Sequence, residues 1–232
     1  MAVSPGLHSG VFVMSEKQYR IVSALMKRHG RTFAAELGVD LKRNTPSPLF
    51  RLLCFSLLTS APVQADIAMK GAIALGRAGW TTPGKLADSR WEARAKTLNE
   101  AGYARVDEKT ATQLDEMNRQ LLDDYHGDLR RLREHADGDV ARAQKALKRF
   151  KGIGETGAGI FLREVQRAWP EFQPFADRAA LKAADKLELP GSAEELAGLV
   201  DRADYPRLVA ALVRAQLARD TDELRRAADS SA

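Results

Sequence analysis

The residues with the clearest chemical potential lie in one segment, 147–162, which reads LKRFKGIGETGAGIFL. Gly152 and Gly154 flank a single apolar residue, Ile153, and this pattern permits a tight turn anchored in the core by the apolar side chain. A helix then begins with small residues, which let it pack closely on the preceding helix. Because the N-terminus of a helix favours an anion, the segment predicts a phosphate-binding turn. Three basic residues add positive charge around it: Lys148, Arg149 and Lys151.

A simpler interpretation of the same segment is a helix–turn–helix corner in which the glycines serve packing alone. A Gly-x-Gly pattern taken by itself does not decide between the two interpretations. A second candidate, Asp177, lies further along the chain, after Trp169-Pro170 and a loop. It begins a predicted helix over 178–187, and aspartate is among the best N-cap residues, so a structural role would account for it as well.

Taken together, a glycine hairpin, an apolar helix, a loop and an aspartate at a new helix start resemble the helix–hairpin–helix DNA glycosylase superfamily, of which endonuclease III is a member. The hairpin of that family reads Leu-Pro-Gly-Val-Gly, which Gly152, Ile153 and Gly154 match. Asp177 matches the catalytic aspartate in its spacing from the hairpin. The apolar stretch 48–60 looks like the first helix of the family's barrel, so the resemblance covers roughly residues 45–190.

The resemblance implies an all-α protein with two helical domains and a cleft between them. A six-helix barrel over 45–158 would include the helix–hairpin–helix motif, and residues 14–44 plus 159–228 would form a second helical domain with Asp177. Asp177 would then be catalytic, stabilising an oxocarbenium-like sugar and helping to activate water. The resemblance also implies DNA contacts for two residues besides the hairpin and its basic neighbours. These are Thr156 and Arg178.

Three departures from the family pattern narrow the expected chemistry. Thr156 occupies the position of the lysine that forms a Schiff base in bifunctional members, and a hydroxyl cannot form an imine. Only one cysteine is present, Cys54, so an iron–sulfur cluster held by four cysteines is excluded, and we expect this thiol in the core. Ala61 stands where relatives often carry a DNA-wedging glutamine; the nearest glutamine is Gln64, and the wedge stays unassigned.

An extruded base could stack on an aromatic side chain in such a site. For each candidate, packing in the core is the alternative that we favour. The candidates are Trp80, Trp91, Phe172 and Phe175. The four histidines show no metal-ligand spacing, and we expect neither a metal nor a cofactor.

The rest of the chain supplies elements to position these residues. Its 232 residues are 44% apolar and 29% charged, as in a folded protein, and 36 Lys plus Arg against 31 Asp plus Glu give a net charge of +5. Apolar residues recur at helical spacing and no segment alternates as a strand does. The expected helices cover 15–29, 47–58, 62–76, 83–88, 91–101, 108–125, 139–150, 155–168, 178–187, 193–200 and 205–227.

These patterns predict a monofunctional base excision repair enzyme, a DNA glycosylase that acts on a damaged or mismatched base in duplex DNA and has no AP-lyase activity. The alternatives are a non-catalytic DNA-binding protein of the same fold and a helical interaction module. The expected partner is double-stranded DNA with a flipped-out base. We also expect a monomer without membrane association, located in the cytoplasm at the nucleoid, with a flexible leader over 1–13 and Met14 as a possible start.

Overall fold

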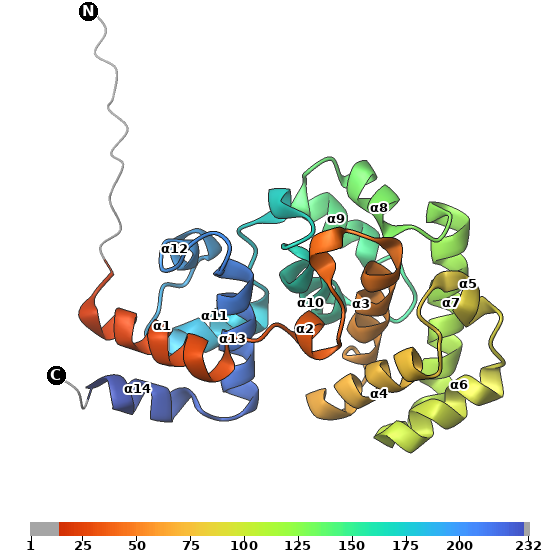
Figure 1. Ribbon diagram of the computed structural model, residues 1–232, viewed down its shortest axis with the longest axis horizontal. Coiled ribbons are helices and arrows are strands. Elements are labelled where there is room, and N and C mark those ends of the chain that lie inside the picture. Colours follow the sequence, from red (N-terminus) through yellow and green to blue (C-terminus); the bar gives the residue numbers. More distant parts are fainter. Residues whose placement is uncertain (1–13, 230–232) are drawn as a thin grey trace, which may run out of the picture.

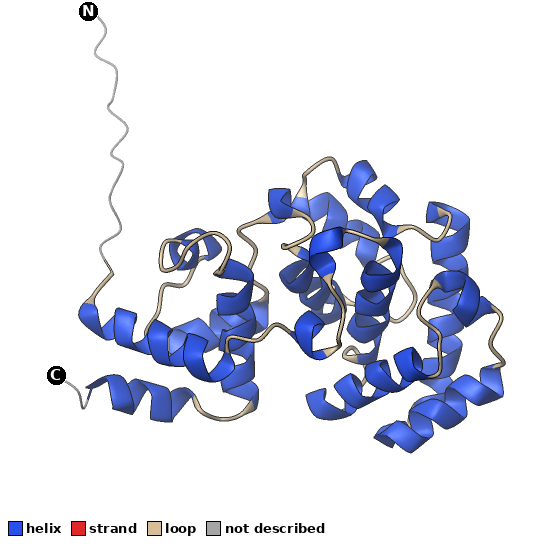
Figure 2. Ribbon diagram, viewed as in Figure 1, coloured by secondary structure: helices blue, strands red, loops and turns tan. Residues whose placement is uncertain are grey.

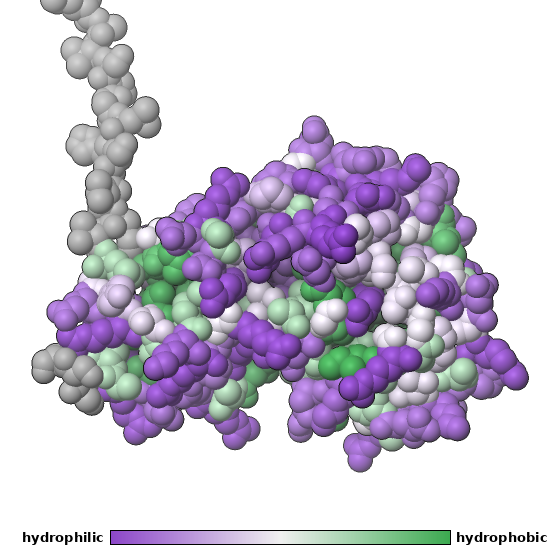
Figure 3. Space-filling view, in the orientation of Figure 1, coloured by the Kyte–Doolittle hydropathy of each residue, from purple (hydrophilic) through white to green (hydrophobic). Residues whose placement is uncertain are grey.

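A computed structural model describes residues 14–229, and every regular element within this range is a helix (Figure 2). The all-α prediction is therefore confirmed for the described residues. The predicted leader, 1–13, lies outside them. No helix in the described range is long and apolar enough to cross a membrane. On the face shown in Figure 3, hydrophilic residues predominate and apolar residues form small, separated patches.

The α-helices begin and end close to the predicted bounds in most cases. They are α1 (Glu16–His29), α2 (Phe33–Glu36), α3 (Pro46–Leu58), α4 (Ala65–Arg77), α5 (Pro83–Ala87), α6 (Trp91–Leu98), α7 (Asp107–Tyr125), α8 (Leu129–Ala136), α9 (Val140–Leu147), α10 (Glu155–Val165), α11 (Arg178–Lys186), α12 (Ala193–Ala197), α13 (Tyr205–Leu217) and α14 (Thr221–Asp229).

Two differences from the predicted elements affect the site. The short helix α2, over 33–36, was not expected, and it carries the buried aromatic residue Phe33. The predicted single helix over 205–227 is interrupted, because Arg219 adopts a left-handed conformation with φ of 58° between α13 and α14. Helix α8 was also missed, although its buried residues Leu129, Leu132 and Ala136 recur at helical spacing.

The helices form two groups (Figure 1). Helices α1, α11, α12, α13 and α14 lie together, with α13 packed against α1 and α11. Helices α3 to α10 form the other group, in which α3 packs against α4 and α10. Helix α10 also contacts α13, so it connects the two groups, and one continuous set of buried apolar residues runs through both.

Small residues at the start of α10 allow two close approaches. A methyl group at Gly157 would lie 2.4 Å from Ser60 Oγ and 2.9 Å from the Ser56 carbonyl oxygen, so α10 is pressed against α3 and the turn that follows it. A methyl group at Gly159 would lie 3.1 Å from Asp177 Cβ. We expected these small residues to serve packing on the preceding helix; the tightest approaches are instead to α3 and to the start of α11.

Replacing Gly157 by alanine should destabilise the protein by about 1–3 kcal/mol, because the added methyl group overpacks the α3–α10 contact. Chemical denaturation measures this change. The matched control is Gly84→Ala in α5, where an added methyl group meets nothing within 4 Å. Equal stability of the two variants would contradict the close contact.

Candidate functional site

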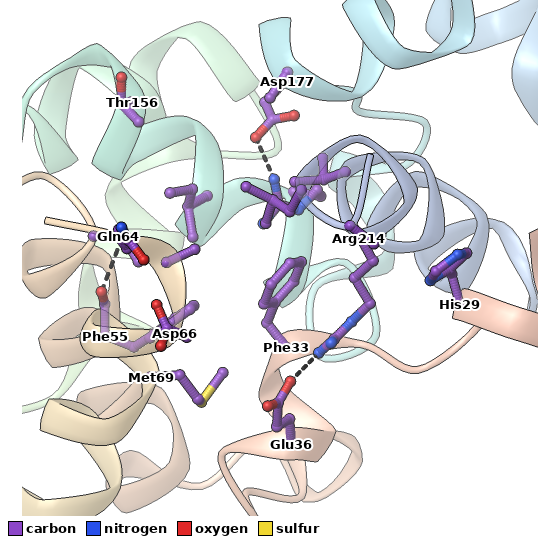
Figure 4. A pocket seen from close by; sticks show the side chains of 18 of the residues that line it. His29, Phe33, Glu36, Phe55, Gln64, Asp66, Met69, Thr156, Asp177 and Arg214 are labelled. Atoms are coloured by element: carbon purple, nitrogen blue, oxygen red, sulfur yellow. Dashed lines mark hydrogen bonds and ion pairs between the residues drawn. The ribbon is translucent and has the colours of Figure 1, made fainter. Parts of the chain in front are cut away.

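A pocket of about 910 Å³ takes side chains from both groups of helices. Figure 4 shows Gln64, Asp66 and Met69 on one side of it and Arg214 on the other, with Asp177 between α10 and α11. Most of the lining is apolar. A volume of this size lies near the upper end of the range for small-molecule sites.

Asp177 lies in the wall of this pocket with 9% of its surface exposed. Its Oδ1 accepts a hydrogen bond of 2.9 Å from the Ala180 backbone N–H, so it is the N-cap of α11 as the sequence predicted. Its Oδ2 accepts a hydrogen bond of 2.5 Å from Arg163 Nη1. Both carboxylate oxygens therefore have protein partners, and their position is fixed from two helices.

Arg163 is the centre of a buried ionic network. Its side chain is 2% exposed, and besides Asp177 it contacts Glu164, with Nε 3.3 Å from Oε1. The other oxygen of Glu164 accepts a hydrogen bond of 2.9 Å from the Ala34 backbone N–H at the start of α2. One guanidinium thus serves two carboxylates, and the network connects α2, α10 and α11.

Phe33, also from α2, lies beneath two arginines. The guanidinium carbons of Arg163 and Arg214 lie 5.0 Å and 4.1 Å from the centroid of its ring. Arg214, on α13, forms an ion pair with Glu36 and donates a hydrogen bond of 3.3 Å to the Thr32 carbonyl. Cation–π contacts of this kind are stronger when they are partly shielded from water, as here.

The glycine turn has the conformation that the sequence predicted. Gly152 adopts a φ of 83°, and Ile153 is 3% exposed and anchors the turn in the core. Gly154 is the N-cap of α10, and no side chain caps this helix. The first backbone N–H groups of α10 are therefore without a side-chain acceptor, which leaves them available to an anion.

The predicted basic residues around this turn do not all remain free. Lys148 Nζ lies 2.6 Å from Glu155 Oε2, across the turn, so much of its charge is neutralised. Arg149, Lys151 and Arg178 are exposed and form no ion pair with any described residue. The acidic residue at 155 reduces the positive potential that the sequence analysis assigned to the hairpin.

Thr156 lines the same pocket as Asp177, so the start of α10 and the start of α11 open onto one space. Gln64 also lines it, whereas Ala61 does not. None of the four aromatic candidates does; they are Trp80, Trp91, Phe172 and Phe175. The aromatic residues of the pocket are Phe33 and Phe55, which stack with their centroids 6.1 Å apart.

Sequence reasoning missed the residues that most define the pocket, namely Arg163, Phe33 and Arg214. One available signal was the charged pair Arg163-Glu164 next to a run of apolar residues in α10, since charges are rarely buried unless paired. Phe33 and Arg214 lie in segments where nothing in the local pattern marks a site.

Two other titratable groups can be placed. Cys54 is buried in the core as predicted, and burial raises the pKa of its thiol to about 12, which makes it chemically inert. A hydrogen bond from Lys70 holds the pKa of Asp66, in the pocket lining, below its usual value. The described residues contain no group of His, Cys, Asp and Glu side chains suited to a metal ion.

The chain matches no protein-family model, no curated protein and no solved structure. Its function is therefore inferred from the residues around the pocket and the turn. The pocket and the turn together provide a buried, fixed carboxylate, an uncapped helix N-terminus and a mostly apolar lining that includes arginines.

Replacing Arg163 by methionine should cost about 3–5 kcal/mol of stability, because it leaves Asp177 and Glu164 buried without their counter-ion. Asp177→Asn keeps an oxygen that can cap α11 and should cost less, about 1–3 kcal/mol. Urea denaturation compares the two variants. If Arg163→Met is no more destabilising than Asp177→Asn, the guanidinium does not hold the network together.

Proposed function

We propose that this protein is a monofunctional DNA glycosylase that hydrolyses the N-glycosidic bond of a damaged or mismatched base in duplex DNA. The observation that supports it best is that Asp177 and Thr156 line the same pocket. Thr156 lies two residues after Gly154 of the glycine turn, so a strand held by phosphate at the turn would place a neighbouring nucleotide near the carboxylate. This is the juxtaposition that the resemblance to helix–hairpin–helix glycosylases implies.

In this proposal the glycine turn and the uncapped start of α10 bind a phosphate, with Arg149, Lys151 and Arg178 around them. Lys148 belongs to the same surface, although Glu155 pairs with it. The target base leaves the stack and enters the pocket, at a cost that is smallest for a damaged or mismatched pair. No cofactor is required for these steps.

Asp177 carries the chemistry in this proposal. Breaking the N-glycosidic bond develops positive charge on the sugar, and a fixed carboxylate beside it stabilises that charge. Arg163 and Ala180 hold the carboxylate in place before the substrate arrives. Thr156 provides no amine, so water completes the reaction and the DNA strand is left uncut.

The domain organisation belongs to the same proposal. Residues 45–158 would form the barrel domain with the helix–hairpin–helix motif, and 14–44 with 159–228 would form the second domain. Two groups of helices support it, as does a pocket that takes residues from both, although the boundary at 158 falls within α10, which lies with α3 to α9. The DNA would bind across the mouth of the pocket, to a single copy of the chain.

A second candidate function is a non-catalytic DNA-binding protein of the same fold. The ion pair between Asp177 and Arg163 favours it, because a guanidinium 2.5 Å away offsets part of the negative charge that a sugar cation would need. Glu155 at the hairpin also argues against tight, catalytic binding of DNA, because it pairs with Lys148 and weakens the binding of phosphate there.

Base release from duplexes carrying uracil, hypoxanthine, alkylated, oxidised or mismatched bases distinguishes the two candidates. After alkali treatment, at least one duplex should break at the lesion, and without alkali it should stay intact. Asp177→Asn should lower the rate by about 100-fold or more, since the charge on the carboxylate is lost.

The matched control is Asp128→Asn. Asp128 also caps a helix, α8, and pairs with an arginine, Arg130, but it lies outside the pocket. Its replacement should leave the rate unchanged. Processing of no lesion by the wild-type protein would rule out the glycosylase and leave the binding protein.

DNA affinity should increase when Glu155 is replaced by glutamine, because Lys148 is then free to contact a phosphate. One added contact steepens the dependence of log affinity on log salt concentration by about 0.9. Fluorescence anisotropy with an undamaged duplex measures both quantities. Glu16→Gln in α1, which breaks an ion pair with Arg20 and changes the net charge equally, is the control.

If both variants raise the affinity alike, only net charge matters and the turn is not the binding surface.

Gly152→Val should change DNA affinity in the opposite direction. Gly152 has a left-handed backbone, and a side chain there would crowd Gln113 and Leu57. Valine should therefore distort the turn and weaken DNA binding.

A further inference from the structure

Three nitrogens of the arginines above Phe33 have no hydrogen-bond partner among the described residues, and one of them, Arg214 Nε, is completely buried. Arg163 uses Nε and Nη1 for Glu164 and Asp177, and its Nη2 has no hydrogen-bond acceptor among the described residues. Arg214 uses Nη2 for Glu36 and Thr32, and its Nη1 has no described acceptor. Arg163 Nη2 and Arg214 Nη1, unlike Arg214 Nε, are not among the completely buried unpaired atoms, and both arginines line the pocket.

These N–H groups are held in fixed positions. Arg163 is only 2% exposed, and its guanidinium is bound by two carboxylates. The Arg214 side chain is 20% exposed, and its guanidinium lies 4.1 Å from the Phe33 ring centroid with Glu36 beside it. The arginine N–H groups are therefore preorganised, and a ligand does not have to immobilise them on binding. Preorganised donors discriminate strongly between a hydrogen-bond acceptor and a donor on the ligand.

The charges around these donors indicate which acceptor fits. Two guanidiniums are accompanied by three carboxylates, those of Asp177, Glu164 and Glu36, so the cluster carries no excess of positive charge. A phosphate or another anion would be repelled by the third carboxylate. A neutral carbonyl oxygen accepts the same N–H groups without this cost.

The other walls of the pocket suit a flat, neutral ring. Apolar side chains line the same pocket as the donors, among them Phe55, Met69 and Ile160. An exocyclic amino group directed at Arg163 or Arg214 would place donor against donor and leave buried N–H groups unpaired, whereas a keto oxygen satisfies them.

From this arrangement we propose that Arg214, with Arg163, selects a nucleobase that presents a keto oxygen to the pocket over one that presents an amino group there. The inference rests on the proposed function for its biological meaning, since it specifies the class of base that is excised. Arg214 lies on α13, outside the segment 45–190 that carries the family resemblance.

Free hypoxanthine and free adenine are the probes, because they differ on one edge of the ring: hypoxanthine has an oxygen at position 6 beside an N1–H group, and adenine has an amino group beside an unprotonated N1. Ligand-observed NMR titration of the full-length protein should show hypoxanthine binding about tenfold more tightly than adenine, as expected for one hydrogen bond to a charged donor. Inorganic phosphate should not displace it. Equal binding, preference for adenine, or no binding of either base would overturn the proposal.

Arg214→Met removes the donor and should abolish the preference for hypoxanthine. Arg207→Met is the control on the same helix: Arg207 also pairs with an aspartate, Asp204, but does not line the pocket. Circular dichroism shows whether both variants fold. The proposal fails if folded Arg214→Met keeps the wild-type preference, and the comparison of the two bases on wild-type protein tests it without any variant.

These results separate the selection of the base from its excision. A tenfold preference for hypoxanthine in a protein that releases no base from any duplex would support the keto-selective pocket and reject the glycosylase. Release of bases by a protein that binds hypoxanthine and adenine equally would support the glycosylase and reject the role given to Arg214.

Discussion

The buried guanidinium of Arg163 is the interaction on which the arrangement of the site depends. It contacts Asp177 at the start of α11 and Glu164 on its own helix, and Glu164 reaches the start of α2. Charges removed from water to this extent are stable only when each has its partner, so none of the three segments can shift alone. The position of the Asp177 carboxylate is thereby set directly by α10 and α11, and α2 contributes through its hydrogen bond to Glu164.

Close packing of α10 makes this network possible. Gly159 has no side chain, and Asp177 lies directly against it; a methyl group there would come within 3.1 Å of Asp177 Cβ. Gly157 allows the same helix to approach α3. The glycines that follow the turn therefore connect the two features of the site: they bring the uncapped start of α10 close to the carboxylate of Asp177 and to α3.

The sequence predicted what depends on neighbouring residues and failed where distant segments meet. Helical periodicity located most helices, the Gly152–Gly154 pattern predicted the turn with its buried Ile153, and Asp177 was expected as an N-cap. The pairing of Lys148 with Glu155 was not foreseen, since it depends on how the turn folds back. The contact of Phe33 with arginines from α10 and α13 joins residues more than a hundred positions apart, and no local pattern encodes it.

The charge balance of the network bears on both candidate functions. Considered as a pair, Asp177 and Arg163 are neutral, which suits a binding protein. Glu164 belongs to the same cluster, however, with its side chain fully buried and Oε1 3.3 Å from the guanidinium. The three groups together carry one net negative charge, and because each side chain is at most 9% exposed, screening by salt is weak. A sugar that becomes positive beside Asp177 would experience the field of this whole cluster. Arg163 can thus fix the geometry of the Asp177 carboxylate without removing its capacity to stabilise a cation. The negative charge of Glu164 keeps the cluster negative even though Arg163 offsets the charge of Asp177.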